Sequence, residues 1–385
     1  MPSPFYFQIP TQIVYGKDST SQIGEIAVKL GIKKGQIVTD KGVVKSGVMA
    51  KVTASLADAG VDYSVFDEVE PNPTIRTVDR AAEQYAKEGC NGVIALGGGS
   101  PLDAGKAVGV LATNPGSAVN YLGVDKAKNP SAPVIAIPTT AGTAAEITDV
   151  AVLSDPEKKA KIGMRSASVA PRYAILDPVL TIDLPPIPTR DSGLDALTHA
   201  VEAYISINSW AASDALALRA IELIGKYLRR AVHNGKDLEA RDGMLTASLL
   251  AGMAFHNTKL CLVHAITGPL GGAYNLPHGA INAIILPYAM DFMLPGAIDK
   301  YVEIAAALGE DVSCLSKREA AEKAVKAVHQ LSADVFLPSG LSFFGDIKEE
   351  DLPPMANTIA GSFMVPLSPR VANAREILAV IKAAL

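Results

Sequence analysis

Residues 93–106 read Val93-Ile-Ala-Leu-Gly-Gly-Gly-Ser-Pro-Leu-Asp-Ala-Gly-Lys106. A continuous apolar run leads into three glycines, and a helical pattern follows them. Glycines permit a tight turn in which backbone N–H groups approach a phosphate, and a helix N-terminus adds partial positive charge. The spacing matches neither a Walker A loop, because Lys106 stands too far on, nor the GxGxxG turn, because Leu102 replaces its third glycine. The segment alone therefore leaves two interpretations open, a structural turn and a phosphate-binding turn.

The first half of the chain repeats this alternation of short apolar runs with helical stretches. We expect strands at residues 36–39, 63–66, 92–96, 133–137, 150–153 and 173–176, and helices at 77–88 and 103–111. Several of the runs are continuous and β-branched, which is typical of strands covered on both faces. The alternation predicts an N-terminal α/β domain built on a doubly wound parallel sheet.

The second half of the chain has a helical texture. Three prolines within residues 184–188 mark the boundary. Beyond them, an amphipathic pattern covers residues 213–232, Ser316 and Glu319 form a capping box before a run to residue 335, and residues 376–385 are again helical. We therefore predict an α/β domain over residues 1–185 and an all-helical domain over residues 186–385.

Charge and composition exclude several classes of protein. The net charge of −5 provides no basic surface for nucleic acid. No basic cluster precedes an apolar core near the N-terminus, and the most apolar stretch, residues 279–298, is interrupted by polar residues and prolines. Three cysteines without metal-type spacing indicate reduced thiols. We expect a soluble, cytoplasmic protein with no nucleic-acid or membrane partner.

A second turn suited to phosphate, Pro138-Thr-Thr-Ala-Gly-Thr143, follows the run that ends at residue 137. Two such turns after parallel strands strengthen the phosphate interpretation, because ligands bind at the carboxyl ends of these strands. Asp40 ends another run. Its carboxylate can accept a hydrogen bond from a ribose 2′-hydroxyl and repel a 2′-phosphate, which favours NAD over NADP. The alternative is an aspartate that caps a helix or begins a turn.

Four side chains are candidate metal ligands. Asp195 and His199 stand four residues apart in a helical stretch, so both lie on one face. His264 lies in an apolar run and His278 in a turn. One carboxylate and three imidazoles without a thiolate suit Fe²⁺ or Zn²⁺ and leave open positions for a substrate. Each residue also has a plain structural interpretation, namely a hydrogen-bonded pair, a core histidine and a turn residue.

Taken together, these motifs resemble the iron-containing (group III) alcohol dehydrogenase family, and within it the lactaldehyde reductases and propanediol dehydrogenases. The resemblance covers essentially the whole chain. Besides the first glycine turn, it rests on Pro138-Thr-Thr-Ala-Gly-Thr-Ala-Ala-Glu-Ile-Thr148, Gly193-Leu-Asp-Ala-Leu-Thr-His-Ala-Val-Glu202, Leu262-Val-His264 and Pro277-His-Gly279.

The resemblance implies an NAD-dependent, metal-dependent oxidoreductase that interconverts a small primary alcohol and its aldehyde. It implies an N-terminal dinucleotide-binding domain, a helical domain that holds metal and substrate, and a homodimer or larger assembly. The ligands of Fe²⁺ or Zn²⁺, which carry the catalysis, would be Asp195, His199, His264 and His278. The cofactor would be held by Asp40, Asn72, Gly98, Gly99, Ser100, Asp103, Thr139, Thr140, Thr143 and Lys161.

One departure from the family concerns the proton. Many members carry a second histidine four residues after the ligand at His264, and this chain has Gly268 there. The usual relay is therefore missing, and we expect a roomier pocket at this point. Val150, Ala151 and Phe255 suggest an apolar lining of the substrate pocket. Arg165 could reach the pocket, so an anionic substrate such as a sulfonated aldehyde is also compatible with the sequence. The sequence does not choose between Fe²⁺ and Zn²⁺.

Two other functions are compatible with parts of the pattern. A lyase resembling dehydroquinate synthase would use NAD and a metal, but it needs several basic residues around a phosphorylated substrate. The segments 194–206 and 255–281, which surround the proposed ligands, contain Lys259 as their only lysine or arginine. A non-catalytic NAD-binding protein would have no need of a complete ligand set. An assay of NADH formation from short alcohols, with and without metal, separates all three functions.

Overall fold

The computed structural model describes residues 6–158 and 160–385. Its contacts divide the chain into two compact units. The α/β unit comprises Ile9–Thr140 and Ala144–Leu184. The helical unit comprises Pro185–Leu385 together with Ala141–Thr143 and the described residues 6–8. The short segment Ala141–Thr143 belongs with the helical unit because Gly142 packs directly on Ser192, where a Cβ would lie 2.6 Å from the carbonyl oxygen.

The α/β unit is built on a six-stranded sheet in the order β1-β9-β6-β4-β2-β3, and every strand pair in it is parallel. Its strands are β1 (Gln12–Tyr15), β2 (Lys34–Val38), β3 (Asp62–Phe66), β4 (Gly92–Gly97), β6 (Val134–Pro138) and β9 (Tyr173–Leu176). All six residues of β4 and all five of β6 are buried, as their continuous apolar runs predict.

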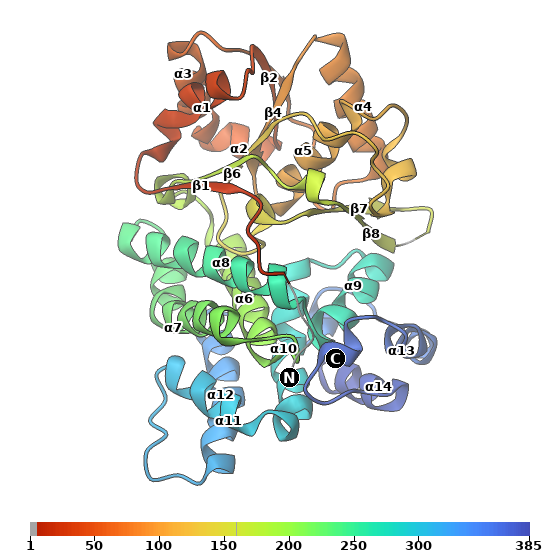
Figure 1. The fold of residues 1–385 in the computed structure, drawn as a ribbon. Helices are drawn as coiled ribbons and strands as arrows, with labels where there is room; N and C mark the ends of the chain where they lie inside the picture. The colour runs from red at the N-terminus through yellow and green to blue at the C-terminus, as the bar shows by residue number, and fades with distance from the viewer. Residues whose placement is uncertain (1–5, 159) are drawn as a thin grey trace. The chain divides into compact units, whose positions relative to one another are not determined.

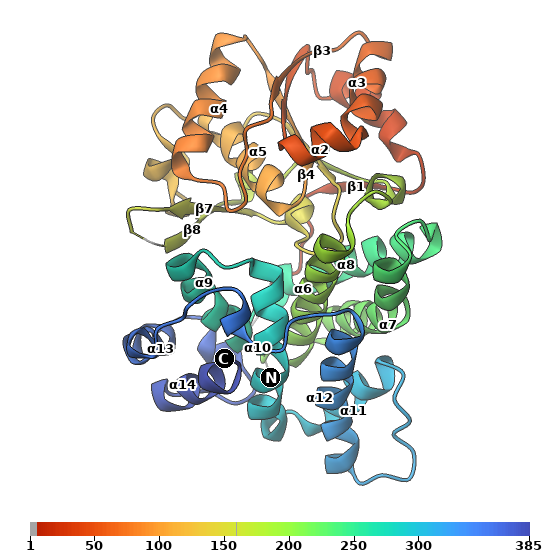
Figure 2. The ribbon, with the colours of Figure 1, turned by 180° about the vertical axis from the view of Figure 1, so that it is seen from behind.

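Helices cover both faces of this sheet. The helices are α1 (Ile23–Lys29), α2 (Lys41–Ser46), α3 (Val48–Asp58), α4 (Ile75–Lys87) and α5 (Gly99–Leu111). Ile94 and Ile135 join the core that contains α1 and α3, whereas their neighbours Val93 and Val134 join the core that contains α4 and α5. Figures 1 and 2 show the two pairs of helices on opposite sides of the sheet. The predicted doubly wound parallel sheet is confirmed.

One strand lies elsewhere than predicted. Residues 150–153 form part of β7 (Val150–Asp155), which belongs to a separate sheet with β5 (Gly123–Val124) and β8 (Ala160–Arg165). β7 runs antiparallel to β8. The connection between them is too short for the crossover that a parallel pair needs, so a hairpin forms. β1, β5 and β8 had no counterpart among the predicted strands.

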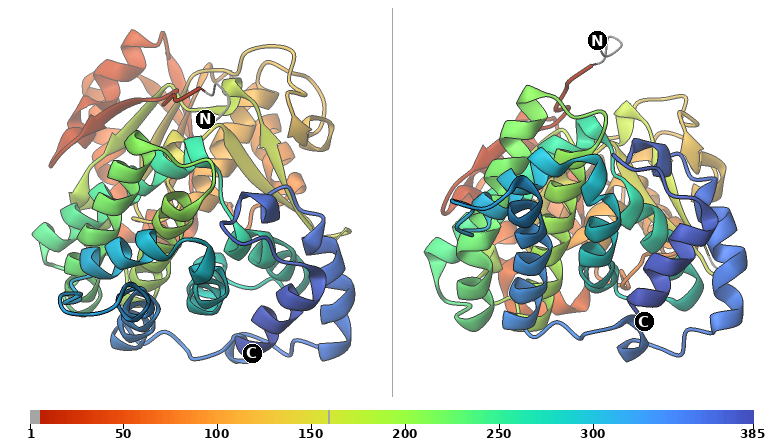
Figure 3. Two further views of the ribbon diagram at one scale, coloured as in Figure 1. Left: turned by 60° about the horizontal axis from the view of Figure 1, so that its bottom comes forward. Right: turned by 90° about the horizontal axis from the view of Figure 1, so that it is seen from below.

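The second unit is helical, as predicted. It contains α6 (Pro186–Ile205), α7 (Ala211–His233), α8 (Leu238–Thr258), α9 (Leu262–Tyr274), α10 (His278–Met293), α11 (Ile298–Ala307), α12 (Lys317–Asp334), α13 (Leu352–Ala360) and α14 (Ala374–Ala383). α6 packs against α7, α8 and α10. Figure 3 views these helices from below, where several run side by side.

Two helix starts in this unit follow from local sequence. The prolines predicted to end regular structure instead begin α6, because Pro186 occupies its first turn, where no intrahelical N–H bond is lost. Ser316 caps α12 and forms the predicted capping box with Glu319.

The hydropathy of the helices was compared with what a membrane span needs, and the finding holds for residues 6–158 and 160–385. Among these residues, no single helix is long and apolar enough to cross a membrane, and the pair α8 and α9, bent by 99°, passes only when taken together.

Candidate metal centre and cofactor turns

Three helices of the helical unit carry the predicted ligands. Asp195 and His199 stand one turn apart on α6, His264 lies near the start of α9, and His278 is the first residue of α10 rather than part of a turn. α10 approaches α6 closely, since a Cβ on Gly279 would lie only 2.4 Å from the carbonyl oxygen of Asp191. This glycine contact brings the start of α10 against the turn of α6 that precedes Asp195.

The four side chains converge. Ligand atoms of Asp195, His199 and His264 all lie within 4.8 Å of one another, and all three residues are buried. The rings of His199 and His264 stack with centroids 4.7 Å apart. The half-buried His278 lies beside this group, with its ring centroid 5.4 Å from that of His264. Residues separated by up to 83 positions in the sequence thus form one cluster.

The electrostatics of the cluster suit a cation. Burial raises the pKa of the Asp195 carboxyl, but His199, the other two imidazoles and a hydrogen bond from Asn282 outweigh it and hold the pKa below its ordinary value. Burial lowers the pKa of His199 below its ordinary value. A carboxylate and a neutral imidazole are the forms that donate lone pairs to a divalent metal ion. The residues present therefore fit Fe²⁺ or Zn²⁺.

Two further buried residues contact the cluster, and the sequence interpretation did not identify either. Glu202 lies on α6 and its Oε2 is 2.6 Å from His264 Nδ1. Asn282 lies on α10 and its Nδ2 donates to Asp195 Oδ1 over 2.7 Å. Their spacing could have marked them, since Glu202 follows His199 by three residues and Asn282 follows His278 by four. Residues at such spacings share a helix face.

The first predicted phosphate turn and the start of the second, residues 138–140, lie side by side in the α/β unit. β4 and β6 are neighbours that end in register, and Thr139 N–H donates to Gly97 C=O over 2.9 Å. Gly97 has φ +144°, and a Cβ there would lie 2.7 Å from Pro101 Cγ, so this position requires glycine. The cap residue of α5, Gly98, has no side chain to bond the first helical turn. This helix N-terminus beside Thr140 fits a cofactor phosphate.

Three other predicted cofactor residues surround the first turn. Asp40 follows β2 and caps α2, because its Oδ1 accepts from Val43 N–H over 3.0 Å. Its Oδ2 lies 3.5 Å from where a Cβ of Gly97 would stand. Asn72 N–H donates to Ser100 Oγ over 3.1 Å. Asp40 is thus a helix cap that also lies against the glycine turn, so its two interpretations are compatible.

The remaining predicted cofactor residues lie in other surroundings. Asp103 forms an ion pair of 2.9 Å with Lys106 and accepts from Val152 N–H over 3.1 Å, while burial raises its pKa. Lys106 is fully buried and donates to Ala145 C=O over 2.9 Å. These contacts tie α5 to β7 and to the segment after the second turn. Lys161 lies on β8. Thr143 belongs to the helical unit.

The surroundings of the metal cluster are partly apolar and partly open. The ring of Phe255 stacks on His199 with centroids 4.4 Å apart. Gly268 follows His264 by one helical turn on α9, and a Cβ at this position would meet no atom within 4 Å. The space expected there is present in the helical unit. Arg165, considered for an anionic substrate, is paired with Asp149 at 3.5 Å.

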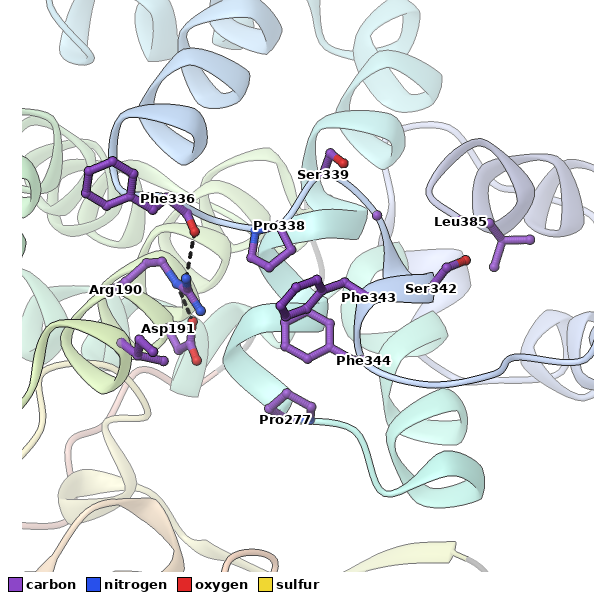
Figure 4. A pocket seen from close by; sticks show the side chains of 12 residues that line it. Arg190, Asp191, Pro277, Phe336, Pro338, Ser339, Ser342, Phe343, Phe344 and Leu385 are labelled. Atoms are coloured by element: carbon purple, nitrogen blue, oxygen red, sulfur yellow. Dashed lines mark hydrogen bonds and ion pairs between the residues drawn. The ribbon is translucent and has the colours of Figure 1, made fainter.

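A pocket of about 690 Å³ lies in the helical unit next to the residues that precede two ligands. Asp191, one turn before Asp195, and Pro277, next to His278, line it together with aromatic side chains (Figure 4). Arg190 donates from Nε to Asp191 Oδ1 and from Nη1 to Phe336 C=O, each over 2.7 Å. Because the guanidinium is already bonded on two sides, the pocket offers mainly rings and aliphatic groups.

Comparison with known proteins identifies the family. Residues 10–178 match the model of iron-containing alcohol dehydrogenases, and residues 189–385 match the C-terminal model of the same family. The chain is 41% identical to 1,3-propanediol dehydrogenase of Klebsiella pneumoniae over 382 residues, which is 99% of this chain and 98% of the relative. It is 38% identical to the NAD-dependent methanol dehydrogenase of Bacillus methanolicus, covering 98% of this chain and 99% of the relative.

A solved structure agrees. The crystal structure of a 1,3-propanediol oxidoreductase superposes with a TM-score of 0.96 at 41% identity and covers 100% of both chains. The predicted family, fold class and enzyme class are confirmed, and the lyase and non-catalytic alternatives are not favoured. The predicted cofactors agree with a family that is iron-containing and has an NAD-dependent member. The chain belongs to the iron-containing alcohol dehydrogenase family and is an alcohol/aldehyde oxidoreductase.

Proposed function

We propose that this oxidoreductase interconverts a small primary alcohol and its aldehyde by hydride transfer to or from NAD(H), with a divalent metal held by Asp195, His199, His264 and His278. The observation that carries this proposal is the buried cluster in which three of the four groups offer ligand atoms within 4.8 Å of one another. One carboxylate and three imidazoles leave coordination positions for a substrate oxygen.

When bound, the metal supplies Lewis acidity to the substrate oxygen, and the nicotinamide accepts or supplies the hydride. The protein's own residues prepare the site for this chemistry. The Asp195 carboxylate balances part of the charge of the ion. Phe255 covers one face of His199 and keeps water from it. Position 268 is a glycine, so it supplies no imidazole to take up the substrate proton.

We propose that the α/β domain, residues 1–185, binds the dinucleotide and that the helical domain, residues 186–385, holds metal and substrate. The helix N-terminus at Gly98, Gly99 and Ser100 receives a phosphate, with Thr139 and Thr140 beside it. Asn72, Asp103, Thr143 and Lys161 support the cofactor. Asp40 accepts the ribose 2′-hydroxyl and disfavours the 2′-phosphate of NADP. The position of its carboxylate beside Gly97 supports this assignment.

The substrate class follows from the lining and from the relatives. Phe255 gives the metal cluster an apolar neighbour, because its ring lies against His199. The named relatives act on 1,3-propanediol and methanol, both small primary alcohols. Arg165, the residue considered for an anionic substrate, is engaged by Asp149.

We propose in addition that the enzyme works in the cytoplasm as a homodimer or larger homo-oligomer. The three cysteines Cys90, Cys261 and Cys314 are all free thiols, which suits a reducing compartment. The oligomeric state is an expectation from the family, and sedimentation of the purified protein measures it.

The direct test of this function is a rate assay on the purified protein. NADH formation from ethanol, 1-propanol and 1,3-propanediol is measured in chelator-treated protein and after return of Fe²⁺ or Zn²⁺, with NAD and then with NADP. We expect turnover only with metal, and faster with NAD. Turnover that survives complete removal of metal contradicts the proposal, as does metal-loaded protein that oxidises no alcohol.

A further inference from the structure

Glu202 lies on the same helix as Asp195 and His199, and its carboxylate contacts the ring of the ligand His264. Glu202 is fully buried on α6. Its Oε1 accepts from the backbone N–H of Val263 over 2.6 Å, and its Oε2 is 2.6 Å from Nδ1 of His264. Both partners lie in the first turn of α9, so one carboxylate holds the start of that helix and its ligand ring.

A second observation agrees with a proton on Nδ1 of His264. Asn282 Nδ2 lies 2.7 Å from Asp195 Oδ1, 3.1 Å from His264 Nε2 and 3.2 Å from His278 Nε2. A carboxylate only accepts, so the amide must turn its NH₂ group toward Asp195. Thr267 bonds the amide oxygen on the other side. The NH₂ group has two N–H bonds, one of which goes to Asp195, so it can donate to only one of the two Nε2 atoms, and it offers neither of them an acceptor.

Both observations favour one tautomer. A carboxylate accepts, so a neutral His264 ring carries its proton on Nδ1, 2.6 Å from Glu202 Oε2, and keeps the lone pair on Nε2. We propose that Glu202 is a positioning residue that locks His264 in the Nδ1–H tautomer, with the Nε2 lone pair aimed into the metal cluster. This inference rests on the proposed function, since it explains how a ligand of that site is held ready.

Two ligand histidines of the cluster, His199 and His264, have hydrogen-bond acceptors of unequal strength at Nδ1. His199 Nδ1 faces a backbone carbonyl, that of Gly142, at 3.2 Å. His264 Nδ1 faces a buried carboxylate, which is the stronger acceptor and raises the basicity of the ligand nitrogen more. A buried carboxylate is costly unless it is bonded, and here each of its oxygens has a close donor. Glu202 is therefore the stronger of these two supports.

The most informative variant is Glu202→Gln, which keeps the shape of the side chain and replaces one accepting oxygen with a donating NH₂ group. Glutamine offers one accepting oxygen and one donating NH₂ group, whereas Val263 N–H and His264 Nδ1–H both donate. One of the two must lose its acceptor, or the His264 proton must move to Nε2, where it blocks metal binding. Outer partners of this kind alter metal affinity by about 10- to 100-fold.

Two measurements on the full-length protein test the proposal. First, long-range ¹H–¹⁵N spectra of the metal-free wild type, with His264 assigned through His264→Gln, report its tautomer among six histidines. Second, competition of Zn²⁺ between protein and a chromophoric chelator gives the dissociation constant of wild type and Glu202→Gln. Glu146→Gln, a buried acid of the α/β unit, is the matched control.

We expect His264 as Nδ1–H in the wild type, a dissociation constant about 10- to 100-fold higher in Glu202→Gln, and an unchanged constant in Glu146→Gln. A wild-type His264 protonated at Nε2 overturns the proposal even if the variant does not fold. A folded Glu202→Gln that binds Zn²⁺ as tightly as wild type overturns it as well. Wild type with the expected tautomer and affinity but no alcohol oxidation contradicts the proposed function and leaves this inference standing.

Discussion

His199 and His278 reach the metal cluster from two different helices, α6 and α10. Replacing either with alanine removes one ligand, so we expect lower metal content and a turnover reduced by at least about 100-fold, given what a Lewis acid contributes. Elemental analysis and the NADH rate measure the two effects. His233→Ala is the control, because His233 lies at the exposed end of α7 and bonds Asp334 C=O. Variants that keep full metal content and full turnover would show that the cluster is not the metal site.

Asp40 has two roles that substitution can separate. Asp40→Gly removes both the cap of α2 and the charge, whereas Asp40→Asn keeps a good capping residue and removes only the charge. Loss of charge repulsion and of a hydrogen bond, worth about 1–3 kcal/mol together, should narrow the preference for NAD over NADP by roughly 10- to 150-fold in both variants. The ratio of kcat/KM for the two cofactors is the measurement. Equal use of both by the wild type would leave Asp40 as a cap only.

Gly268 tests whether space or a missing relay controls this position. Its φ is not in the left-handed region and a Cβ meets no atom within 4 Å, so the backbone accepts a larger residue. We expect Gly268→His and Gly268→Leu to reduce kcat/KM for larger alcohols while sparing ethanol, because both fill the same space. If Gly268→His instead raises turnover on every substrate and Gly268→Leu does not, the imidazole and not the volume is what matters.

The sequence predicted the four ligand residues, which belong to recognisable motifs. It did not predict the residues that contact those ligands, because these contacts depend on how the helices pack. Asp195 and His199 could be paired by helical spacing, and His264 and His278 joined them through the family pattern. Glu202 and Asn282 lie in the same motifs, but a polar residue on a helix has several ordinary roles. Their contacts appear only when α6, α9 and α10 pack together.

Among the elements, α5 lies so close to the sheet that its glycines face strand backbone. A Cβ on Gly105 would lie 2.5 Å from Ala95 Cβ and 3.3 Å from its Cα. Gly105→Ala should therefore push α5 away from β4 and destabilise the protein by about 1–3 kcal/mol. Gly163→Ala on β8 is the control, since no atom lies within 4 Å of its Cβ position. Denaturant midpoints measure both, and an unchanged midpoint for Gly105→Ala would contradict the close packing.

Strands with a continuous apolar run were predicted in the right sheet. Strands whose place depends on the neighbouring strands were misplaced or missed. β4 and β6 are buried along their whole length. β7 alternates between buried and less buried residues, which shows that one face lacks cover and explains why it leaves the main sheet. β1 occupies an edge with two half-buried and two exposed residues, so its sequence carries no strong hydrophobic signal.

For the molecule as a whole, Glu146 should make stability depend on pH. Burial raises its pKa from 4.5 to about 7, an effect that Lys106 offsets only in part. Between these values the folded protein binds a proton that the unfolded chain releases, so stability falls as pH rises from 4.5 to 7, by up to about 3 kcal/mol. Glu146→Gln should lose this part of the dependence. Denaturant midpoints at pH 5 and pH 7.5 measure it, and parallel profiles for variant and wild type would contradict the burial argument.

For the enzyme as a whole, we propose that a divalent metal binds among Asp195, His199, His264 and His278. Anomalous diffraction at the absorption edge of the bound metal, on crystals of protein purified without chelator, locates that ion directly. We expect one strong anomalous peak about 2.0–2.2 Å from a carboxylate oxygen of Asp195 and from one ring nitrogen of each histidine. A peak at any other site, in crystals of protein whose turnover requires metal, would contradict it.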